Sequence, residues 1–169
     1  MPARARATRA RSHDALVVMA SLRSALAGAI AGGAAAYFLL ARRSKAEAIV
    51  TANASPAGGH YSQAIKHGEL VFVSGLLPIL PNGRKLTGAP FEEQAAAVLQ
   101  NLDAIVAAAG SSLSKLVQVR VYITDIGNWG KFNELYAAAL GTHKPARAVV
   151  PVPALHFGVL LEVEAIASL

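Results

Sequence analysis

The stretch FEEQAAAVLQNLDAIVAAAGSSLSKLVQVRVYIT, residues 91–124, decides the fold. Its first part repeats apolar residues at steps of three and four, which predicts an amphipathic helix over residues 91–109. Two glutamates near its start and Gly110 after its end fit these bounds. In residues 117–123, apolar and polar residues then alternate, which predicts a strand with one polar face.

Further elements are predicted on both sides of this stretch: a hairpin of residues 63–66 and 70–74, a second helix over 132–140, and two strands over 148–150 and 159–167. The second hairpin strand is apolar enough to be buried on both faces. The order of elements predicts an α+β domain, a mixed sheet with two helices on one face. The other face then needs a cover, which favours oligomerisation.

The positive charge of the chain belongs to its N-terminal part. Residues 1–45 carry eight lysines and arginines against one acid, whereas residues 46–169 carry eight against nine acids. The net charge of +6 is therefore no sign of nucleic-acid binding by the folded part, and no nucleic-acid partner is expected. The chain has no cysteine, which excludes disulfides, thiolate metal sites and a cysteine nucleophile.

Residues 1–45 are predicted to be a targeting or membrane-anchor segment. Residues 1–13 contain four arginines and no acid, which is typical of a transit peptide to a mitochondrion or plastid. Residues 25–41 form an uncharged apolar run at the lower length limit for a transmembrane helix, so a single-pass anchor before a soluble domain is the alternative. A third alternative is that the start of the gene is misassigned. Residues 46–60, rich in alanine, serine and glycine, are predicted to be a linker before a domain over 61–169.

Charged residues lie beside or within the last two predicted strands. Arg147 directly precedes the strand over 148–150, and Glu162 and Glu164 lie within the strand over 159–167. Charges inside apolar strands are costly unless they are paired, solvated at a cleft or used on a ligand. Arginine can hold a carboxylate by two parallel hydrogen bonds. Spacing alone leaves two readings open, a ligand site and a structural ion pair of Arg147 with Glu164 or Glu134.

Five short motifs resemble, in order and spacing, those of the Rid family of reactive intermediate deaminases (YjgF-type proteins), and specifically its arginine-containing RidA-like subgroup. The motifs are Tyr61-Ser-Gln-Ala-Ile65, Val73-Ser-Gly75, Phe132-Asn-Glu-Leu-Tyr136, Pro145-Ala-Arg147 and Glu162-Val-Glu-Ala-Ile-Ala167. The resemblance implies a chorismate-mutase-like fold and a homotrimer with active sites in the clefts between subunits. It also implies hydrolysis of 2-enamine and 2-imine acids, such as 2-aminoacrylate, to 2-keto acids and ammonia. No cofactor and no metal are expected.

The resemblance also implies roles for single residues. Arg147 would hold the substrate carboxylate, and Glu162 would position or deprotonate water and pass the proton to the leaving nitrogen. The implied substrate-binding residues are Tyr61, Ser74, Gly75 and Asn133. Glu164 is taken as structural.

Simpler explanations stand beside these roles. Tyr61 could be a packed aromatic, Ser74 a turn-capping hydroxyl and Asn133 an exposed helix residue. The chain also departs from the family where Leu155-His156-Phe157 replaces the usual Leu-Pro turn and where Val149 replaces a cysteine of some members. These departures concern the substrate range. A non-catalytic trimeric ligand-binding or interaction protein of the same fold is the alternative function.

Overall fold

The computed structural model describes residues 45–169. The predicted targeting or anchor segment, including residues 25–41, lies outside the described residues except for Lys45. Within residues 45–169, no helix has the length and apolar character needed to cross a membrane.

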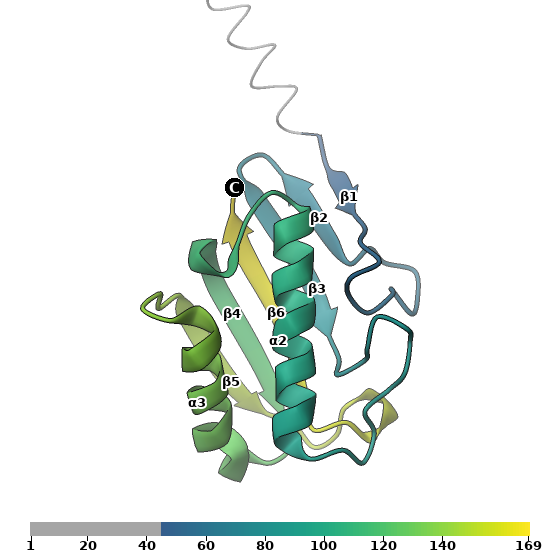
Figure 1. The fold of residues 1–169 in the computed structure, drawn as a ribbon, viewed down its shortest axis with the longest axis vertical. Coiled ribbons are helices and arrows are strands. Elements are labelled where there is room, and N and C mark those ends of the chain that lie inside the picture. Colours follow the sequence, from purple (N-terminus) through teal and green to yellow (C-terminus); the bar gives the residue numbers. More distant parts are fainter. Residues whose placement is uncertain (1–44) are drawn as a thin grey trace, which may run out of the picture. The chain divides into compact units, whose positions relative to one another are not determined.

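The described chain forms a six-stranded sheet and two α-helices (Figure 1). The strands are β1 (Glu47–Ile49), β2 (Ala64–His67), β3 (Leu70–Leu76), β4 (Leu116–Ile123), β5 (Ala146–Pro151) and β6 (Leu161–Ser168), and the helices are α2 (Phe91–Ala108) and α3 (Trp129–Leu140). Their order across the sheet is β1-β2-β3-β6-β4-β5, in which only β4 and β5 are parallel neighbours. Both helices lie on the same face of the sheet (Figure 1). The predicted chorismate-mutase-like α+β class is therefore confirmed.

The core lies between the sheet and the helices. Along β6, buried Leu161, Val163, Ala165 and Ala167 alternate with half-buried polar and apolar residues. The apolar stripe of α2 packs on this face, with Leu102 fully buried in it. Each buried leucine or valine side chain contributes about 1.5–3 kcal/mol by leaving water, so this face fixes the register of the strands.

Within residues 45–169, no helix covers the opposite face of the sheet, which we call the open face (Figure 1). On β3, Val71 and Val73 are buried, whereas Phe72 between them is 41% exposed. The prediction that this strand is buried on both faces is therefore wrong within residues 45–169, because both described helices pack on the other side. An exposed aromatic ring in the middle of a sheet is a surface that a second chain can cover.

Residues 46–60, predicted to be a linker, instead belong in part to the folded unit. Strand β1 pairs antiparallel with β2, and Ala54 and Ser55 are buried. The buried Gln63 side chain accepts a hydrogen bond from the Thr51 amide at 2.7 Å and donates to the carbonyls of Thr51 and Ser55 at 3.0 and 2.7 Å. One buried amide thus holds an irregular segment in place, which composition alone does not reveal.

Candidate active site

Arg147 and Glu162 lie on opposite faces of the sheet. On β5, Arg147 is the register partner of Val119, whose side chain is fully buried beneath the helices. On β6, Glu162 is the register partner of Tyr122, on the open face. Strand β4 also lies between β5 and β6. Strands β5 and β6 are therefore consecutive in sequence but not adjacent in the sheet. A single chain does not bring the charges of Arg147 and Glu162 together.

The arginine half-site consists of Arg147, Asn133 and Tyr136. The guanidinium Nη2 of Arg147 donates a hydrogen bond to Asn133 Oδ1 at 2.9 Å, and its Cζ lies 4.8 Å from the centre of the Tyr136 ring. These residues line a cavity of about 480 Å³, together with Lys144 and His143. A cavity lined by a lysine and an arginine suits a small organic acid.

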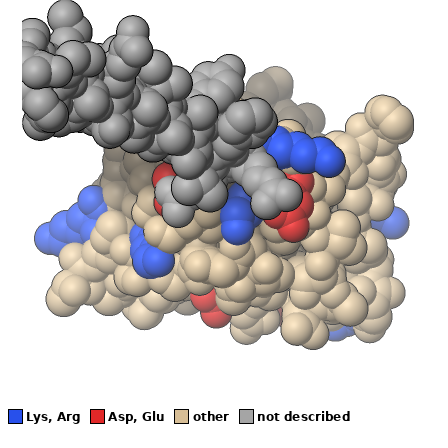
Figure 2. All heavy atoms as spheres, turned by 90° about the horizontal axis from the view of Figure 1, so that it is seen from above, with Lys and Arg blue, Asp and Glu red and all other residues tan. Residues whose placement is uncertain are grey.

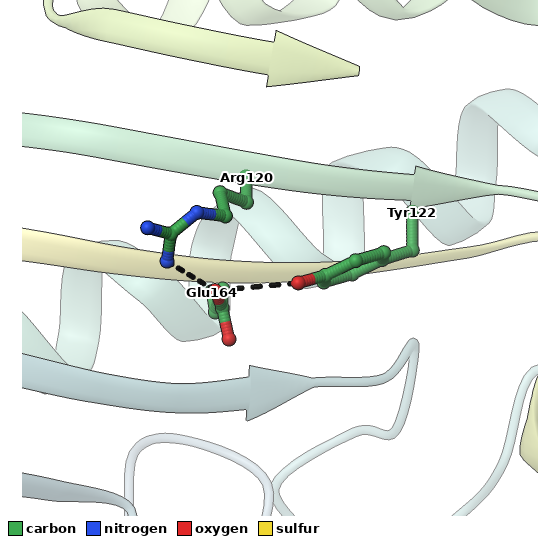
Figure 3. A network of polar contacts seen from close by, with 3 residues as sticks. All are labelled: Arg120, Tyr122 and Glu164. Atoms are coloured by element: carbon green, nitrogen blue, oxygen red, sulfur yellow. Dashed lines mark hydrogen bonds and ion pairs between the residues drawn. The ribbon is translucent and has the colours of Figure 1, made fainter. Parts of the chain in front are cut away.

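Arg120, and not Arg147, pairs with Glu164. Its Nη1 lies 2.6 Å from Glu164 Oε1, and the Tyr122 hydroxyl donates to the same oxygen at 3.3 Å (Figure 3). Within residues 45–169, Arg147 forms no ion pair with Glu164 or Glu134. The described residues therefore give no support to a structural ion pair of Arg147, whereas Glu164 is paired with Arg120.

The carboxylate half-site consists of Glu162, Gly75, Ser74 and Tyr61. A Cβ atom built on Gly75 would lie 2.0 Å from Glu162 Oε1, so the carboxylate rests directly on the glycine backbone. Tyr61, Ser74 and Gly75 line one small pocket. The six predicted site residues thus form two separate groups. Arg147 lies with Asn133, whereas Tyr61, Ser74 and Gly75 line one pocket and Glu162 contacts Gly75.

Ser74 and Tyr61 also have structural contacts of their own. The Ser74 hydroxyl donates to the carbonyl of Ser62 at 2.7 Å, so its proton is already used. The Tyr61 hydroxyl accepts a hydrogen bond from the Gly58 amide at 3.1 Å, and the residue is 53% exposed. Ser74 can therefore offer a ligand only acceptor lone pairs, whereas exposed Tyr61 can offer its hydroxyl proton.

The pKa of Glu162 is raised above its ordinary value. Burial is the main cause, the neighbouring Glu164 adds repulsion, and His156 opposes the shift. A carboxylate with a raised pKa is a stronger base and accepts a proton from water more readily than an exposed one does. The environment thus favours the acid–base role that the resemblance implied for Glu162.

Changing the charges beside Glu162 should move the acidic limb of the pH–rate profile in opposite directions. Glu164→Gln removes a repelling charge, so the pKa of Glu162 falls and activity persists to lower pH. Arg120→Gln leaves Glu164 uncompensated, so the pKa rises and activity is lost at higher pH. The measurement is kcat/KM against pH for both variants and the wild type. Limbs that coincide, or that move together, would contradict the assignment of Glu162 as the base.

Gly75→Ala should impair activity while the fold survives. The new methyl group would occupy the position of Glu162 Oε1, and the flexible end of the glutamate can swing aside to relieve the clash. Because a misplacement of about 1 Å can cost about 100-fold in rate, we expect a loss of that order. Initial rates and thermal unfolding of the variant test this. A large drop in melting temperature with normal specific activity would show that the contact is structural.

Two aromatic residues that were not among the predicted site residues also lie beside Arg147. Tyr136 is buried, and its ring and that of Trp129 lie over the guanidinium of Arg147, at 4.8 and 5.8 Å from Cζ. The spacing from Asn133 placed both on one helix face and could have indicated this. The contact with Arg147 joins α3 to β5 and depends on the tertiary fold.

The fold and the site define a class of small α+β protein in which the candidate site residues are divided between the two faces of the sheet. Comparisons with known proteins identify the family. Residues 51–169 match the family model described as Endoribonuclease L-PSP. Protein MMF1, mitochondrial, of Saccharomyces cerevisiae is 42% identical over 70% of this chain and 81% of its own length. Reactive Intermediate Deaminase A, chloroplastic, of Arabidopsis thaliana is 37% identical over 74% of this chain and 67% of its own.

A solved structure agrees with these sequence matches. The crystal structure of E. coli TdcF with bound serine superposes with a TM-score of 0.69 at 37% identity, covering 73% of this chain and 98% of the other. The chain therefore belongs to the Rid (YjgF-type) family, as its five motifs indicated.

Proposed function

We propose that the protein hydrolyses reactive 2-enamine and 2-imine acids, such as 2-aminoacrylate, to 2-keto acids and ammonia without a cofactor. Family membership and the name of the Arabidopsis relative support this activity. The single observation that carries it is the state of Arg147. Its guanidinium is fixed in a cavity, is hydrogen-bonded to Asn133 and lacks a carboxylate partner within residues 45–169.

In the proposed reaction, Arg147 binds the substrate carboxylate through two N–H groups and thereby fixes the position of C2. The enamine first gains a proton at C3 and loses one from nitrogen, which gives the imine. Glu162 takes a proton from water as the water oxygen bonds to C2 and the C2–N π bond opens, and it passes this proton to the nitrogen, which gives a carbinolamine. Glu162 then takes the proton of the new C2 hydroxyl and passes it to the amino nitrogen, the C2–N bond breaks, its electron pair leaves with ammonia, and C2 becomes a ketone. Water and imine are consumed in equal amounts.

The catalytic unit that we propose is a homotrimer. Because Arg147 and Glu162 point to opposite faces of one sheet, a second chain must supply one of them to a shared cleft. Phe72 on the open face and the unpaired edge of β5 are surfaces that such a neighbour can cover. Tyr61, Ser74 and Gly75 would then face the arginine half-site of the neighbouring subunit.

The direct test generates 2-aminoacrylate with a serine dehydratase and follows pyruvate release with and without the protein. We expect the protein to shorten the lifetime of the imine well below that of spontaneous hydrolysis. An unchanged lifetime would refute the activity. If calorimetry then still showed binding of a 2-keto acid, the non-catalytic ligand-binding alternative would replace it.

Charge does not support a nucleic-acid substrate, despite the description of the family model. Residues 46–169 carry eight basic and nine acidic residues. On the face in Figure 2, the visible basic residues lie scattered among uncharged and acidic ones and do not form a stripe. Strong RNA binding by electrostatics needs a continuous basic surface.

We further propose that residues 1–45 direct the protein to an organelle. The named mitochondrial and chloroplastic relatives and the arginine-rich composition of residues 1–13 support this. Sequencing the N-terminus of the mature protein distinguishes the alternatives. A start well beyond Lys45 would exclude an anchor, whereas a retained segment with which the protein resists carbonate extraction from membranes would support one.

A further inference from the structure

Three side chains of α3 contact the guanidinium of Arg147 from one face of the helix. Trp129, Asn133 and Tyr136 follow the spacing i, i+4, i+7, which places them in one row. The ring centres of Tyr136 and Trp129 lie 4.8 and 5.8 Å from Arg147 Cζ, and Asn133 Oδ1 lies 2.9 Å from Nη2. The helix therefore meets the arginine with two ring faces and one hydrogen bond. We call Trp129 and Tyr136 the aromatic clamp.

The Tyr136 ring is itself held rigidly. Its centre lies 5.5 Å from that of the fully buried Phe132, at an interplanar angle of 34°. The Tyr136 hydroxyl is buried and finds no hydrogen-bond partner within residues 45–169. Burial raises the pKa of Tyr136 to about 12, so the ring stays neutral at physiological pH. The part of Tyr136 that its neighbours use is therefore the ring face, not the hydroxyl.

Asn133 leaves the binding capacity of Arg147 almost intact. A guanidinium has five N–H donors, arranged as two paired edges that share Nη2. Asn133 takes one of the two Nη2 hydrogens, and the other four donors make no hydrogen bond within residues 45–169. Whichever hydrogen Asn133 takes, one paired edge stays complete. That edge lies in the plane that the aromatic clamp fixes.

We propose that Trp129 and Tyr136 are positioning residues that hold the Arg147 guanidinium ready for two-pronged binding of the substrate carboxylate. A free arginine side chain loses much rotational freedom when it binds a ligand. With the clamp in place, that ordering is already complete before the ligand arrives. The identity of the ligand as a 2-imino or 2-keto acid rests on the proposed function, whereas the clamp on Arg147 does not.

Replacing either ring by leucine should weaken substrate binding more than it slows the chemical step. We expect Tyr136→Leu and Trp129→Leu each to raise KM about tenfold, the order that cation–π contacts support. We expect kcat to stay within about threefold, because the carboxylate is bound equally in ground and transition states. Tyr136→Phe keeps the ring face and should restore the affinity lost in Tyr136→Leu.

A control on the same helix separates positioning from loss of stability. Leu140 is buried at the end of α3 and is absent from the contacts of Arg147. Leu140→Val should lower the melting temperature and leave KM unchanged. If Tyr136→Phe weakened affinity as much as Tyr136→Leu, or if both leucine variants kept the wild-type KM, the proposal would be overturned.

Two further measurements do not depend on catalysis. Titration calorimetry with 2-oxobutanoate should give about tenfold weaker binding for the leucine variants, whether or not the protein hydrolyses imines. Nitrogen-15 relaxation of the Arg147 Nε–H should show a rigid group in the wild type and Tyr136→Phe, and a mobile one in the leucine variants. Equal rigidity in all four proteins would overturn the clamp even without any ligand. Loss of rigidity without imine hydrolysis would leave the clamp standing and refute the proposed activity.

Discussion

Arg147→Ala is expected to lower kcat/KM for 2-aminoacrylate by about 1000-fold, because the anchor of the substrate carboxylate is lost. Arg147 is half-buried, and its guanidinium is held in one orientation by Asn133 and Tyr136. Water or buffer cations that enter the space left in the alanine variant would not bind the carboxylate in this fixed geometry. The measurement is pyruvate release in the coupled dehydratase assay at several imine fluxes.

Arg147→Lys is the matched variant for this experiment. It keeps the positive charge but replaces a planar fork by a single ammonium group, so we expect an intermediate loss of about 10- to 100-fold. Circular dichroism and the melting temperature should confirm that both variants fold. If alanine and lysine variants matched the wild type, Arg147 would be a surface cation and the arginine half-site would have to be abandoned.

The helices, the central strands and their buried faces were predictable because each follows a simple period. The stretch from residue 91 to 123 repeats at steps of three and four and then of two, and the structure places α2 and β4 there within a residue. Strand β1 was not predictable in this way. It has three residues, and the segment after it is fixed by the polar contacts of Gln63, which leave no hydrophobic pattern.

The open face illustrates a second limit. Val71-Phe72-Val73 is a continuous apolar run, and such a run predicts burial on both sides. Within residues 45–169 only one side is covered. The sequence pattern does not state where the second cover comes from. The exposed Phe72 is thus a residue that we expect a second subunit to cover in the assembly.

The sequence named candidate site residues but not their geometry. The motifs named Arg147, Asn133, Gly75 and Glu162, and the structure adds a physical reason for the glycine, since the Glu162 carboxylate rests on it. The opposite orientation of Arg147 and Glu162 follows from strand order and register, which spacing along the chain does not reveal. The contact of the Tyr136 ring with Arg147 was not predicted, because a buried aromatic residue on a helix usually only packs in the core.

Two inactive variants should restore activity when they assemble together. Arg147→Ala lacks the cation and Glu162→Gln lacks the base, and each alone should be about 1000-fold impaired. If each site takes Arg147 from one chain and Glu162 from another, a mixed oligomer contains some sites in which both residues are intact. Random assembly from equal amounts should make about a quarter of the sites complete in a closed ring of subunits.

The two variants would be co-expressed with different affinity tags, and mixed oligomers would be isolated by two successive purifications. We expect these to recover a substantial part of the wild-type rate, whereas homogeneous preparations mixed after assembly should not. A pair of variants from the same half-site, Arg147→Ala with Asn133→Ala, is the control and should not complement, because every site would contain a damaged arginine half. Mixed oligomers as inactive as their parents would mean that the cation and the carboxylate do not act in one shared site, and the opposite orientation of Arg147 and Glu162 would then exclude the proposed mechanism.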